Sequence, residues 1–344
     1  MSFTFNQKLP VPKEIKAQYP VSEKLAAIKA GKDQELMDVI SGKSDKFLVI
    51  IGPCSADNEE AVCDYISRLK RVQEKVADKL ILVPRIYTNK PRTTGEGYKG
   101  MLHQPDPEKE PDLLAGLIAI RKMHIHALET FEMPIADEML YPENYWYLAD
   151  ILSYVAVGAR SVENQQHRLV SSGIHVPTGM KNPTSGDYSV MLNSVLAAQH
   201  SHNFLFRGWD VTTTGNPYAH TILRGAVNKH GQSNPNYHYE DLMRLYDMYQ
   251  DWGVVNPACI IDANHSNSAK KYKEQIRIVK EILHSRSHSN EIRALVKGVM
   301  VESYLVEGTQ KIGSENHIYG KSITDPCLGW QDSETLIYEI ADRI

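Results

Sequence analysis

Four side chains that are able to bind a metal ion lie far apart along the chain: Cys54, His265, Glu302 and Asp325. Together they offer one thiolate, one imidazole and two carboxylates, a mixed donor set that suits a first-row divalent ion. A site of this kind that keeps an open position can act as a Lewis acid. Spacing alone identifies no metal motif, because the sequence has neither Cys-x-x-Cys nor His-Glu-x-x-His.

The other three cysteines call for separate interpretations. We expect Cys63, in the middle of a predicted helix, and Cys259, within an apolar strand, to be structural, since a buried cysteine usually serves as a small apolar residue. Cys327 follows Asp325 by two residues and stays open: it could lie near the metal and be oxidised with it. With 4 cysteines and no export signal, we expect no disulfide framework.

A second group of polar residues is cationic, and its members follow the apolar runs that we interpret as strands. Cations that converge on one mouth repel one another unless an anion binds between them, so phosphates and carboxylates are the expected ligands. Arginine grips such oxyanions with two parallel hydrogen bonds, whereas lysine can also donate a proton. The group consists of Arg85, Lys90, Arg92, Arg160, Lys181 and Arg224.

Short apolar runs that alternate with amphipathic stretches from Phe47 onward predict the elements that position these residues. Near-continuous apolar runs are typical of parallel strands that are buried on both faces, and their alternation with helical patterns indicates successive βα units. We expect eight strands: Phe47–Ile51, Leu80–Ile86, Pro134–Asp137, Tyr154–Val157, Ile174–Thr178, Asn203–Phe206, Ala258–Ile261 and Val296–Val301.

The predicted helices carry apolar stripes at helical spacing. A helix after the first strand is expected to begin with a capping box formed by Asp57 and Glu60. Another is expected at Glu23–Ile40, ahead of the first strand. The stripes are Val62, Ile66, Leu69, Val72 and Val76; Leu242, Leu245, Tyr249 and Trp252; and Leu336, Ile337, Ile340 and Ile344.

Eight βα units in this length predict an α/β fold, a (β/α)8 TIM barrel over residues 46–344, preceded by an N-terminal extension over residues 1–45. An open, doubly wound sheet is the alternative, but no Gly-x-Gly-x-x-Gly turn follows the first strand. In a barrel, the active site is built from loops after the carboxyl ends of the strands. We therefore expect the cationic and metal-binding groups to meet there.

The composition excludes several kinds of partner. The formal net charge of -4 argues against nucleic acid, whose phosphates attract a basic surface. No apolar run approaches the roughly 18 residues that a membrane span requires, and the first residues do not resemble a signal peptide. We expect a cytoplasmic protein that has neither a membrane nor a nucleic acid as its partner.

With these residues assembled, the chain resembles the class I synthases of 3-deoxy-D-arabino-heptulosonate 7-phosphate (DAHP), of the microbial type regulated by aromatic amino acids. The likeness extends from Pro10 to the C-terminus. Its most specific segments are Ile51–Ser55, Lys90–Thr94, Gly158–Arg160, Ile222–Gly225, Gly298–Ser303 and Tyr319–Asp325. Members of the family are metal-dependent transferases that condense phosphoenolpyruvate with erythrose 4-phosphate and release phosphate, the first step of the shikimate pathway.

The resemblance implies roles for individual residues. It implies Cys54, His265, Glu302 and Asp325 as ligands of a divalent ion, for which we expect Mn, Fe, Co or Zn. As a hypothesis of mechanism, we interpret Lys90 as the general acid. The resemblance implies that Arg92 and Thr93 hold the aldose phosphate. It also implies a homodimer or homotetramer and an aromatic amino acid effector. The residues implied around phosphoenolpyruvate are Arg85, Lys90, Glu138, Ala159, Arg160, Lys181 and Arg224.

Three segments depart from the family pattern, and none removes a predicted ligand. Asn264 stands where serine is usual, Gly95–Gly97 adds a residue, and Ser161–Asn164 replaces Thr-Thr-Glu-Ser. The nearest rival is the related synthase that uses arabinose 5-phosphate, whose Lys-Ala-Asn-Arg-Thr-Ser differs from Lys90–Thr94. A different hypothesis is a non-catalytic barrel that binds sugar phosphates, but such a protein need not keep the complete set of ligands and cations.

Overall fold

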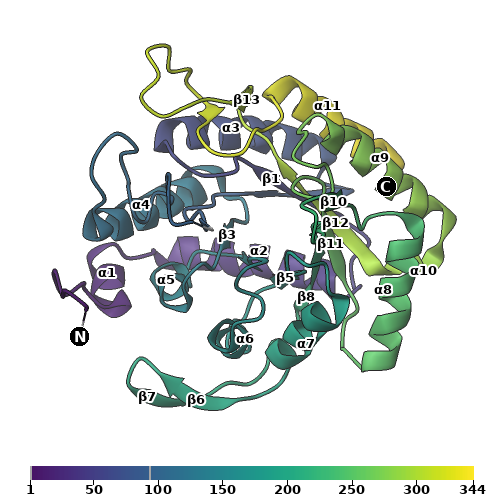
Figure 1. Cartoon of the computed structure of the whole chain (residues 1–344), viewed down its shortest axis with the longest axis horizontal. Helices are drawn as coiled ribbons and strands as arrows, with labels where there is room; N and C mark the ends of the chain where they lie inside the picture. The colour runs from purple at the N-terminus through teal and green to yellow at the C-terminus, as the bar shows by residue number, and fades with distance from the viewer. Residues whose placement is uncertain (1, 93) are drawn as a thin grey trace.

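The protein folds around an eight-stranded parallel barrel, shown in Figure 1 in the computed structural model, which describes residues 2–92 and 94–344. The strand order is β2-β1-β12-β11-β8-β5-β4-β3, and a parallel bridge between Arg85 and Ala136 joins the two ends of the sheet. The strands are β1 (Phe47–Gly52), β2 (Leu80–Pro84), β3 (Ala136–Glu138), β4 (Tyr154–Val157), β5 (Thr178–Lys181), β8 (Ala219–Leu223), β11 (Cys259–Asp262) and β12 (Val296–Glu302).

Helices surround the barrel, and each packs an apolar face against the outside of the strands (Figure 1). The surrounding helices are α3 (Glu59–Val76), α4 (Leu113–Phe131), α5 (Pro142–Leu148), α6 (Gln165–Ser171), α7 (Tyr188–Gln199), α8 (Tyr239–Trp252), α9 (Glu274–His288), α10 (Asn290–Leu295) and α11 (Trp330–Arg343). The predicted barrel fold is therefore confirmed.

The N-terminal segment contributes two helices, α1 (Pro12–Gln18) and α2 (Glu23–Ile40). The second has the predicted bounds, and in Figure 1 it crosses the centre of the barrel. Its buried residues Leu36, Val39 and Ile40 belong to the same apolar cluster as Leu48 and Ile50 from inside the barrel. This helix closes the amino-terminal end of the barrel and leaves the opposite end open for the site.

The prediction for the sixth barrel strand was wrong. Asn203–Phe206 is a strand, β6, but it pairs antiparallel with β7 (Trp209–Thr212) in a hairpin outside the barrel. The sixth barrel strand is β8, which pairs with β5 and β11. His220 lies within this strand. The fifth strand was placed too early, since β5 begins at Thr178 and ends on Lys181.

The predicted apolar stripes of the helices are confirmed, but the predicted capping box is not. The stripe of α3 is buried throughout, as are Leu242, Leu245 and Tyr249 on α8 and Leu336, Ile337 and Ile340 on α11. The capping box is wrong: Asn58 is the N-cap of α3 and accepts a hydrogen bond from the N–H of Ala61. Asp57 instead accepts a hydrogen bond from the Tyr304 hydroxyl at 3.3 Å.

Two further two-stranded sheets lie outside the barrel. In one, β9 (Ala226–Val227) pairs with β10 (Ser233–Asn234), and in the other, β13 (Val306–Thr309) pairs with β14 (Lys321–Ser322).

Candidate active site

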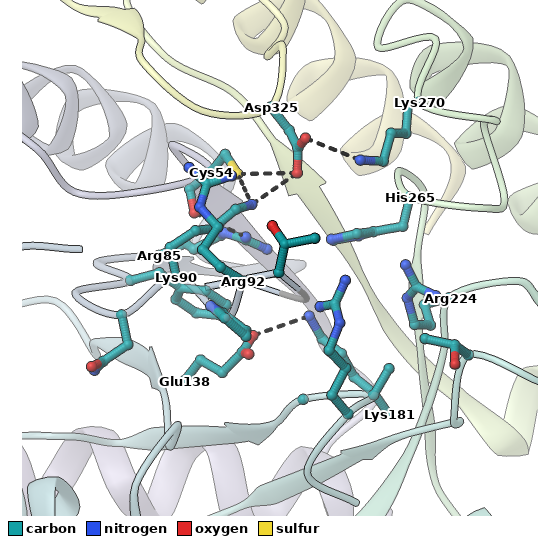
Figure 2. Close-up of a pocket in the computed structure, with 18 of the residues that line it drawn as sticks. Cys54, Arg85, Lys90, Arg92, Glu138, Lys181, Arg224, His265, Lys270 and Asp325 are labelled. Atoms are coloured by element: carbon teal, nitrogen blue, oxygen red, sulfur yellow. Dashed lines mark hydrogen bonds and ion pairs between the residues drawn. The ribbon is translucent and has the colours of Figure 1, made fainter. Parts of the chain in front are cut away.

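A pocket of about 330 Å³ opens at the carboxyl ends of the barrel strands, and Figure 2 shows the side chains that converge on it. All six predicted cations line this pocket, although they come from five different strand ends and loops. More than half of the chain separates Cys54 from His265 and Asp325, which also line it. The barrel thus brings together the residues that the sequence placed after its strands.

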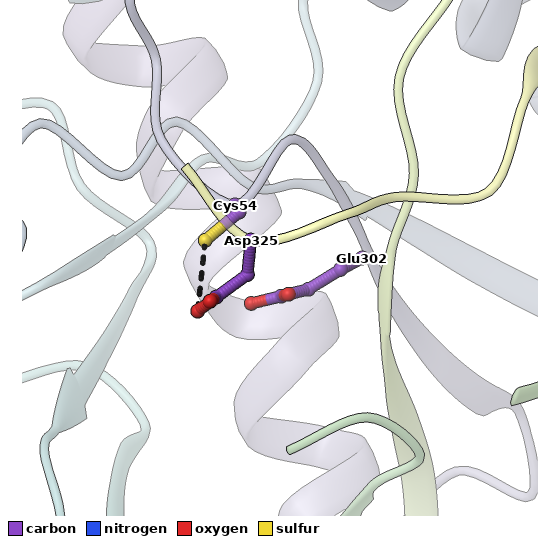
Figure 3. Close-up of side chains that lie close together, drawn as sticks. All are labelled: Cys54, Glu302 and Asp325. Carbon is purple, nitrogen blue, oxygen red and sulfur yellow. Dashed lines mark hydrogen bonds between the residues drawn. The ribbon is translucent and has the colours of Figure 1, made fainter. Parts of the chain in front are cut away.

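Three of the predicted metal ligands form a compact group, drawn in Figure 3. Cys54 follows β1, Glu302 ends β12, and Asp325 lies in the loop before α11. One ligand atom from each residue lies within 4.8 Å of the other two. Glu302 is fully buried beneath the pocket, and Cys54 is 1% exposed. Buried donors of this kind fit a divalent ion, because a thiolate and two carboxylates need positive charge between them.

The ammonium group of Lys90 lies against this group of ligands. Its Nζ is 2.7 Å from Sγ of Cys54 and 2.8 Å from Oδ2 of Asp325. Burial alone would lower the pKa of Lys90, but the negative charges of Cys54, Asp325 and Glu302 raise it above its ordinary value. Burial likewise favours a raised pKa at Asp325, yet Lys90 and Lys270 hold that pKa well below its usual range. Lys90 is therefore protonated and Asp325 ionised.

The thiol of Cys54 behaves differently. Burial raises its pKa, the charge of Glu302 raises it further, and Lys90 only partly opposes them. A thiol must lose its proton to become a strong metal ligand. A divalent ion would supply the positive charge that this deprotonation requires.

Glu302 is held from several sides. Arg85, which is 2% exposed, donates from Nη2 to Oε1 of Glu302 at 2.7 Å. Asn264 donates from Nδ2 to the other oxygen, Oε2, at 2.5 Å. Gln275 binds the backbone of Glu302 through both ends of its amide, at 2.8 Å and 3.0 Å. Burial alone would raise the pKa of Glu302, but Arg85 and His265 lower it, so the carboxylate is charged.

His265 completes the predicted ligand set at a greater distance. Its Nε2 lies 3.8 Å from Oε1 of Glu302, on the side of the pocket opposite Cys54 (Figure 2). On its other side, Nδ1 lies 2.8 Å from Oδ2 of Asp262. Burial alone would raise the pKa of Asp262, but His265 and Lys181 lower it well below its usual range. Asp262 is therefore a carboxylate that orients the imidazole.

The remaining cations surround the pocket next to this anionic group. Lys181, at the end of β5, lies 3.4 Å from Oε2 of Glu138 and 3.8 Å from Oδ2 of Asp262. Burial lowers the pKa of Arg224. Within the described part of the chain, the buried Nη1 atoms of Arg224 and Arg85 have no hydrogen-bond partner. These donors can bind an anionic ligand without breaking a protein contact.

The backbone of the pocket wall lies close to Glu138. Gly158 follows β4 and begins the turn, and a Cβ atom there would lie 2.5 Å from Oε1 of Glu138, so a larger residue would displace this carboxylate. Ala159 and Arg160 follow and line the pocket. Arg92 lies at the entrance and donates from Nε to the carbonyl of Tyr98 at 2.8 Å. Thr93, predicted to bind the aldose phosphate, lies outside the described residues.

Several residues of the site were missed in the sequence. Lys270 lines the pocket and lies 3.2 Å from Oδ1 of Asp325. It belongs to an irregular segment in which Ala269 and Lys270 adopt positive φ, so no strand-end pattern marked it. Asp262 and Asn264 stood beside His265 in the sequence, but their contacts with His265 and Glu302 depend on the tertiary fold.

The other cysteines lie where their sequence context suggested. Cys259 is buried in β11, and Cys63 lies half-buried on α3. Cys327 is fully buried, and its thiol lies 3.5 Å from the carbonyl oxygen of Asp325. Burial and the charges of Glu302 and Cys54 raise the pKa of Cys327, so it remains a thiol. All four are free.

Comparison with known proteins gives one consistent result. A family model described as the DAHP synthetase I family matches residues 18–337. The chain belongs to this family. A phospho-2-dehydro-3-deoxyheptonate aldolase of Haemophilus influenzae is 37% identical over 98% of this chain and 92% of its own length. A Trp-sensitive aldolase of the same name from Escherichia coli is 34% identical over 98% and 95%.

A solved structure extends the likeness of this DAHP synthetase I family member to three dimensions. The aldolase of Francisella tularensis superposes with a TM-score of 0.92 at 28% identity, covering 100% of this chain and 98% of the other. The class of enzyme predicted from the motifs, a transferase of the 3-deoxy-7-phosphoheptulonate synthase type, is confirmed. None of the helices in residues 2–92 and 94–344 combines the length and apolar character that crossing a bilayer requires.

Proposed function

We propose that this chain condenses phosphoenolpyruvate with erythrose 4-phosphate to give DAHP and phosphate, using a divalent ion bound by Cys54, His265, Glu302 and Asp325. The observation that carries the proposal is the division of one pocket into two parts. A Cys/Glu/Asp group lies beside His265 with Lys90 and Arg85 in contact with it, and the other predicted cations line the rest of the wall. The first part suits a Lewis-acidic metal, and the second suits two phosphorylated substrates.

The cations bind and orient the substrates in this proposal. Arg85 and Lys181 are buried, Arg224 is half-buried, and all three offer donors for the carboxylate and phosphate of phosphoenolpyruvate. Arg92 lies nearer the entrance, where it binds the phosphate of the aldose together with Thr93. Holding both reactants in this geometry removes much of the entropic cost of their encounter.

Lys90 supplies the proton in the proposed reaction. The bound ion, when present, supplies a Lewis acid for the aldehyde oxygen. As the methylene carbon of phosphoenolpyruvate bonds to the aldehyde carbon, the aldehyde oxygen gains an electron pair and takes a proton from Lys90, which is held protonated by its anionic neighbours. Water adds to the former enol carbon and gives up one proton, which restores the ammonium form of Lys90. The resulting hemiketal phosphate breaks its C–O bond, and the remaining hydroxyl becomes the ketone as its proton passes to the departing phosphate, which leaves as inorganic phosphate.

A phosphate-release assay tests this proposal directly. We expect turnover with erythrose 4-phosphate, little with arabinose 5-phosphate, loss of turnover on treatment with a chelator, and recovery with added Mn²⁺. Three variants should each lower the rate about a hundredfold, because each raises the activation free energy by about 3 kcal/mol. They are Cys54→Ala, His265→Ala and Lys90→Ala. Cys63→Ala is the matched control, because Cys63 is a half-buried thiol on α3 outside the site.

Three results would contradict the proposal. Preference for arabinose 5-phosphate would favour the related eight-carbon synthase, and tight sugar phosphate binding without phosphate release would favour a non-catalytic barrel. Unchanged turnover in Cys54→Ala would remove the proposed metal centre. Thermal unfolding of each variant separates a lost function from a lost fold.

Regulation by an aromatic amino acid is a further part of the proposal, and the Trp-sensitive name of several relatives supports it. A second cavity, of about 730 Å³, lies between the start of α1 and the β6–β7 hairpin. Trp146, Phe204 and Phe206 give it apolar walls that suit an aromatic ring, and Lys13 and Arg207 offer partners for a carboxylate.

Phenylalanine, tyrosine and tryptophan should be assayed as inhibitors. We expect Phe204→Ala to weaken the inhibition. No response to any of the three would reject this part.

We also assign residues 1–45 to an extension that builds a homodimer or homotetramer, and residues 46–344 to the catalytic barrel. Phe5 in the extension and Trp209 at the hairpin are 91% and 74% exposed. Large apolar groups exposed on the same side of a molecule are typical of protein interfaces. The four free cysteines agree with a reducing, cytoplasmic location. Sedimentation of the full chain and of a variant that lacks residues 2–9 tests the oligomer.

A further inference from the structure

Both oxygens of the Glu302 carboxylate are fixed by the protein, and each by a different kind of donor. Arg85 binds Oε1, but it also lines the pocket and serves a substrate. Asn264 binds Oε2 at 2.5 Å, is 2% exposed and does not line the pocket. Asn264 is therefore a neutral donor whose side chain faces the carboxylate from behind rather than the substrate.

The orientation of the Asn264 amide is set by its other contact. The hydroxyl of Ser268 donates to Oδ1 of Asn264 at 2.8 Å, which turns the amide NH₂ group toward Glu302. The opposite orientation would place an amide oxygen against a carboxylate oxygen, and the two would repel each other. The pair is buried, since Ser268 is 4% exposed, so water does not compete for these bonds.

The backbone of Asn264 reaches the second ligand. Its N–H donates to Oδ1 of Asp262 at 3.0 Å, and Oδ2 of Asp262 lies 2.8 Å from Nδ1 of His265. One residue thus contacts Glu302 directly and His265 through Asp262. Asn264 holds Oε2, so the carboxylate plane is fixed with Oε1, which Arg85 also binds, directed toward His265 at 3.8 Å from Nε2.

We propose that Asn264 is a positioning residue of the metal centre: it fixes the plane of the Glu302 carboxylate, so that one carboxylate oxygen stays directed toward His265. This inference rests on the metal centre assigned under the proposed function. The supports of metal ligands commonly change metal affinity by about 10–100-fold when they are removed. A serine at position 264 ends one bond shorter than asparagine, so Asn264→Ser would leave Oε2 without this donor.

The test uses Co²⁺ as the probe, because its absorption reports both thiolate ligation and coordination geometry. We expect Asn264→Ser to weaken Co²⁺ binding, measured in competition with a chromogenic chelator, by about 10–100-fold and to shift the d–d bands. Ser268→Ala keeps the amide but removes the contact that orients it, and should give a smaller loss in the same direction. A purely structural role would leave the bands unchanged.

Asn216→Ser is the matched control. Asn216 is 1% exposed and donates to the carbonyl of Val176 at 3.1 Å and to Oγ1 of Thr178 at 3.2 Å, at the start of β5 and away from the ligands. It should lower the melting temperature and leave Co²⁺ affinity and spectrum unchanged. If Asn264→Ser fails to fold, Ser268→Ala decides the question alone.

Two failures are distinguishable. Wild-type affinity and spectrum in Asn264→Ser, or in Ser268→Ala where that variant decides, would overturn the positioning role while the metal centre stands. A wild-type protein without a Co²⁺–thiolate band that Cys54→Ala removes would overturn the metal centre itself, and this inference with it.

Discussion

Two arginines, each with a buried Nη1 atom, show how single residues prepare the site for anions. Arg85 donates hydrogen bonds from Nε and Nη2 to Pro53, Cys54 and Glu302. Its buried Nη1 has no hydrogen-bond partner within residues 2–92 and 94–344. Nη1 of Arg224 is in the same position. Leaving a buried donor unpaired costs about 1–3 kcal/mol. A phosphate or carboxylate that binds in the pocket can accept a hydrogen bond from this donor and so offset the cost.

His220 gives a prediction about pH at the residue scale. It is fully buried inside the barrel; its Nδ1 is 2.9 Å from the carbonyl of Tyr218, and its Nε2 is 2.7 Å from the Tyr154 hydroxyl. The neutral ring satisfies both contacts by donating to the carbonyl and accepting from the hydroxyl. Burial lowers its pKa from 6.5 to about 4.

Because the folded pKa lies below the unfolded one, His220 costs no stability above pH 6.5. As the pH falls from 6.5 toward 4, the unfolded chain takes up a proton that the folded chain refuses, and stability drops. The loss reaches about 3 kcal/mol at 1.4 kcal/mol per pKa unit. Urea unfolding between these pH values should show a weaker pH dependence in His220→Gln than in the exposed control His230→Gln. Equal slopes would contradict the assignment.

The residues that bind ligands were easier to predict than the residues that hold them. Cys54 and Arg85 lie just after β1 and β2, and the rule that barrel strands point their carboxyl ends at the site grouped them. Lys181, at the end of β5, and Arg224, after β8, were grouped with them although the strands before them were misplaced. Asn264 acts on Glu302 across 38 positions of sequence. No local pattern encodes such a contact.

At the scale of elements, the sixth strand shows where apolar patterning misleads. Asn203–Phe206 has an apolar run, but its side chains alternate between exposed and buried, as in a hairpin with one free face. The true strand, β8, is buried throughout and yet contains His220 and Thr221. Their polar atoms are satisfied by Tyr154 on β4, Tyr249 on α8, and the carbonyls of Tyr218 and Ala258, which precede β8 and β11. The sequence of β8 therefore reads as polar, although the strand is part of the core.

Helix α2 gives the prediction at this scale. Leu36 is 0% exposed and packs with residues from inside the barrel, so α2 belongs to the core and is not an appended arm. Leu36→Ala should lower the free energy of unfolding by about 2–5 kcal/mol, because it opens a cavity that the barrel cannot collapse to fill. Urea unfolding followed by tryptophan fluorescence measures the change.

Leu113→Ala on α4 is the control, since Leu113 is 40% exposed and should lose less than about 1 kcal/mol. A similarly small loss in Leu36→Ala would mean that α2 can leave the barrel without disturbing it. The N-terminal segment would then be a separate unit, in contrast to the packing of Leu36, Val39 and Ile40.

For the whole molecule, the alternation of apolar runs and helical stripes was sufficient to predict a closed barrel, because eight βα units leave few other ways to bury strands on both faces. Closure itself depends on the contact between Arg85 and Ala136, which no local pattern indicates. The placement of α2 across the amino-terminal end follows from the same cause, since the apolar interior at that end needs a cover.

The distribution of charge leads to the last prediction. The chain has a net charge of -4, yet the six predicted cations and Lys270 line one pocket. A local positive field inside a negative molecule attracts anionic substrates toward the mouth, and salt screens it within about 10 Å at 0.1 M. With the metal ion saturating, kcat/KM for phosphoenolpyruvate should fall about tenfold as salt rises from 0.01 M to 0.5 M, while kcat changes little.

Two single-charge variants separate attraction at the mouth from net charge. Arg160→Gln removes an exposed cation that lines the pocket, and it should flatten the dependence of kcat/KM on salt. Lys24→Gln removes an exposed cation on α2, at the closed end of the barrel, and should leave the slope as it is. Both variants change the net charge by the same amount. Equal slopes in the two would therefore mean that the whole molecule's charge, and not the field of the pocket, governs the approach of substrate.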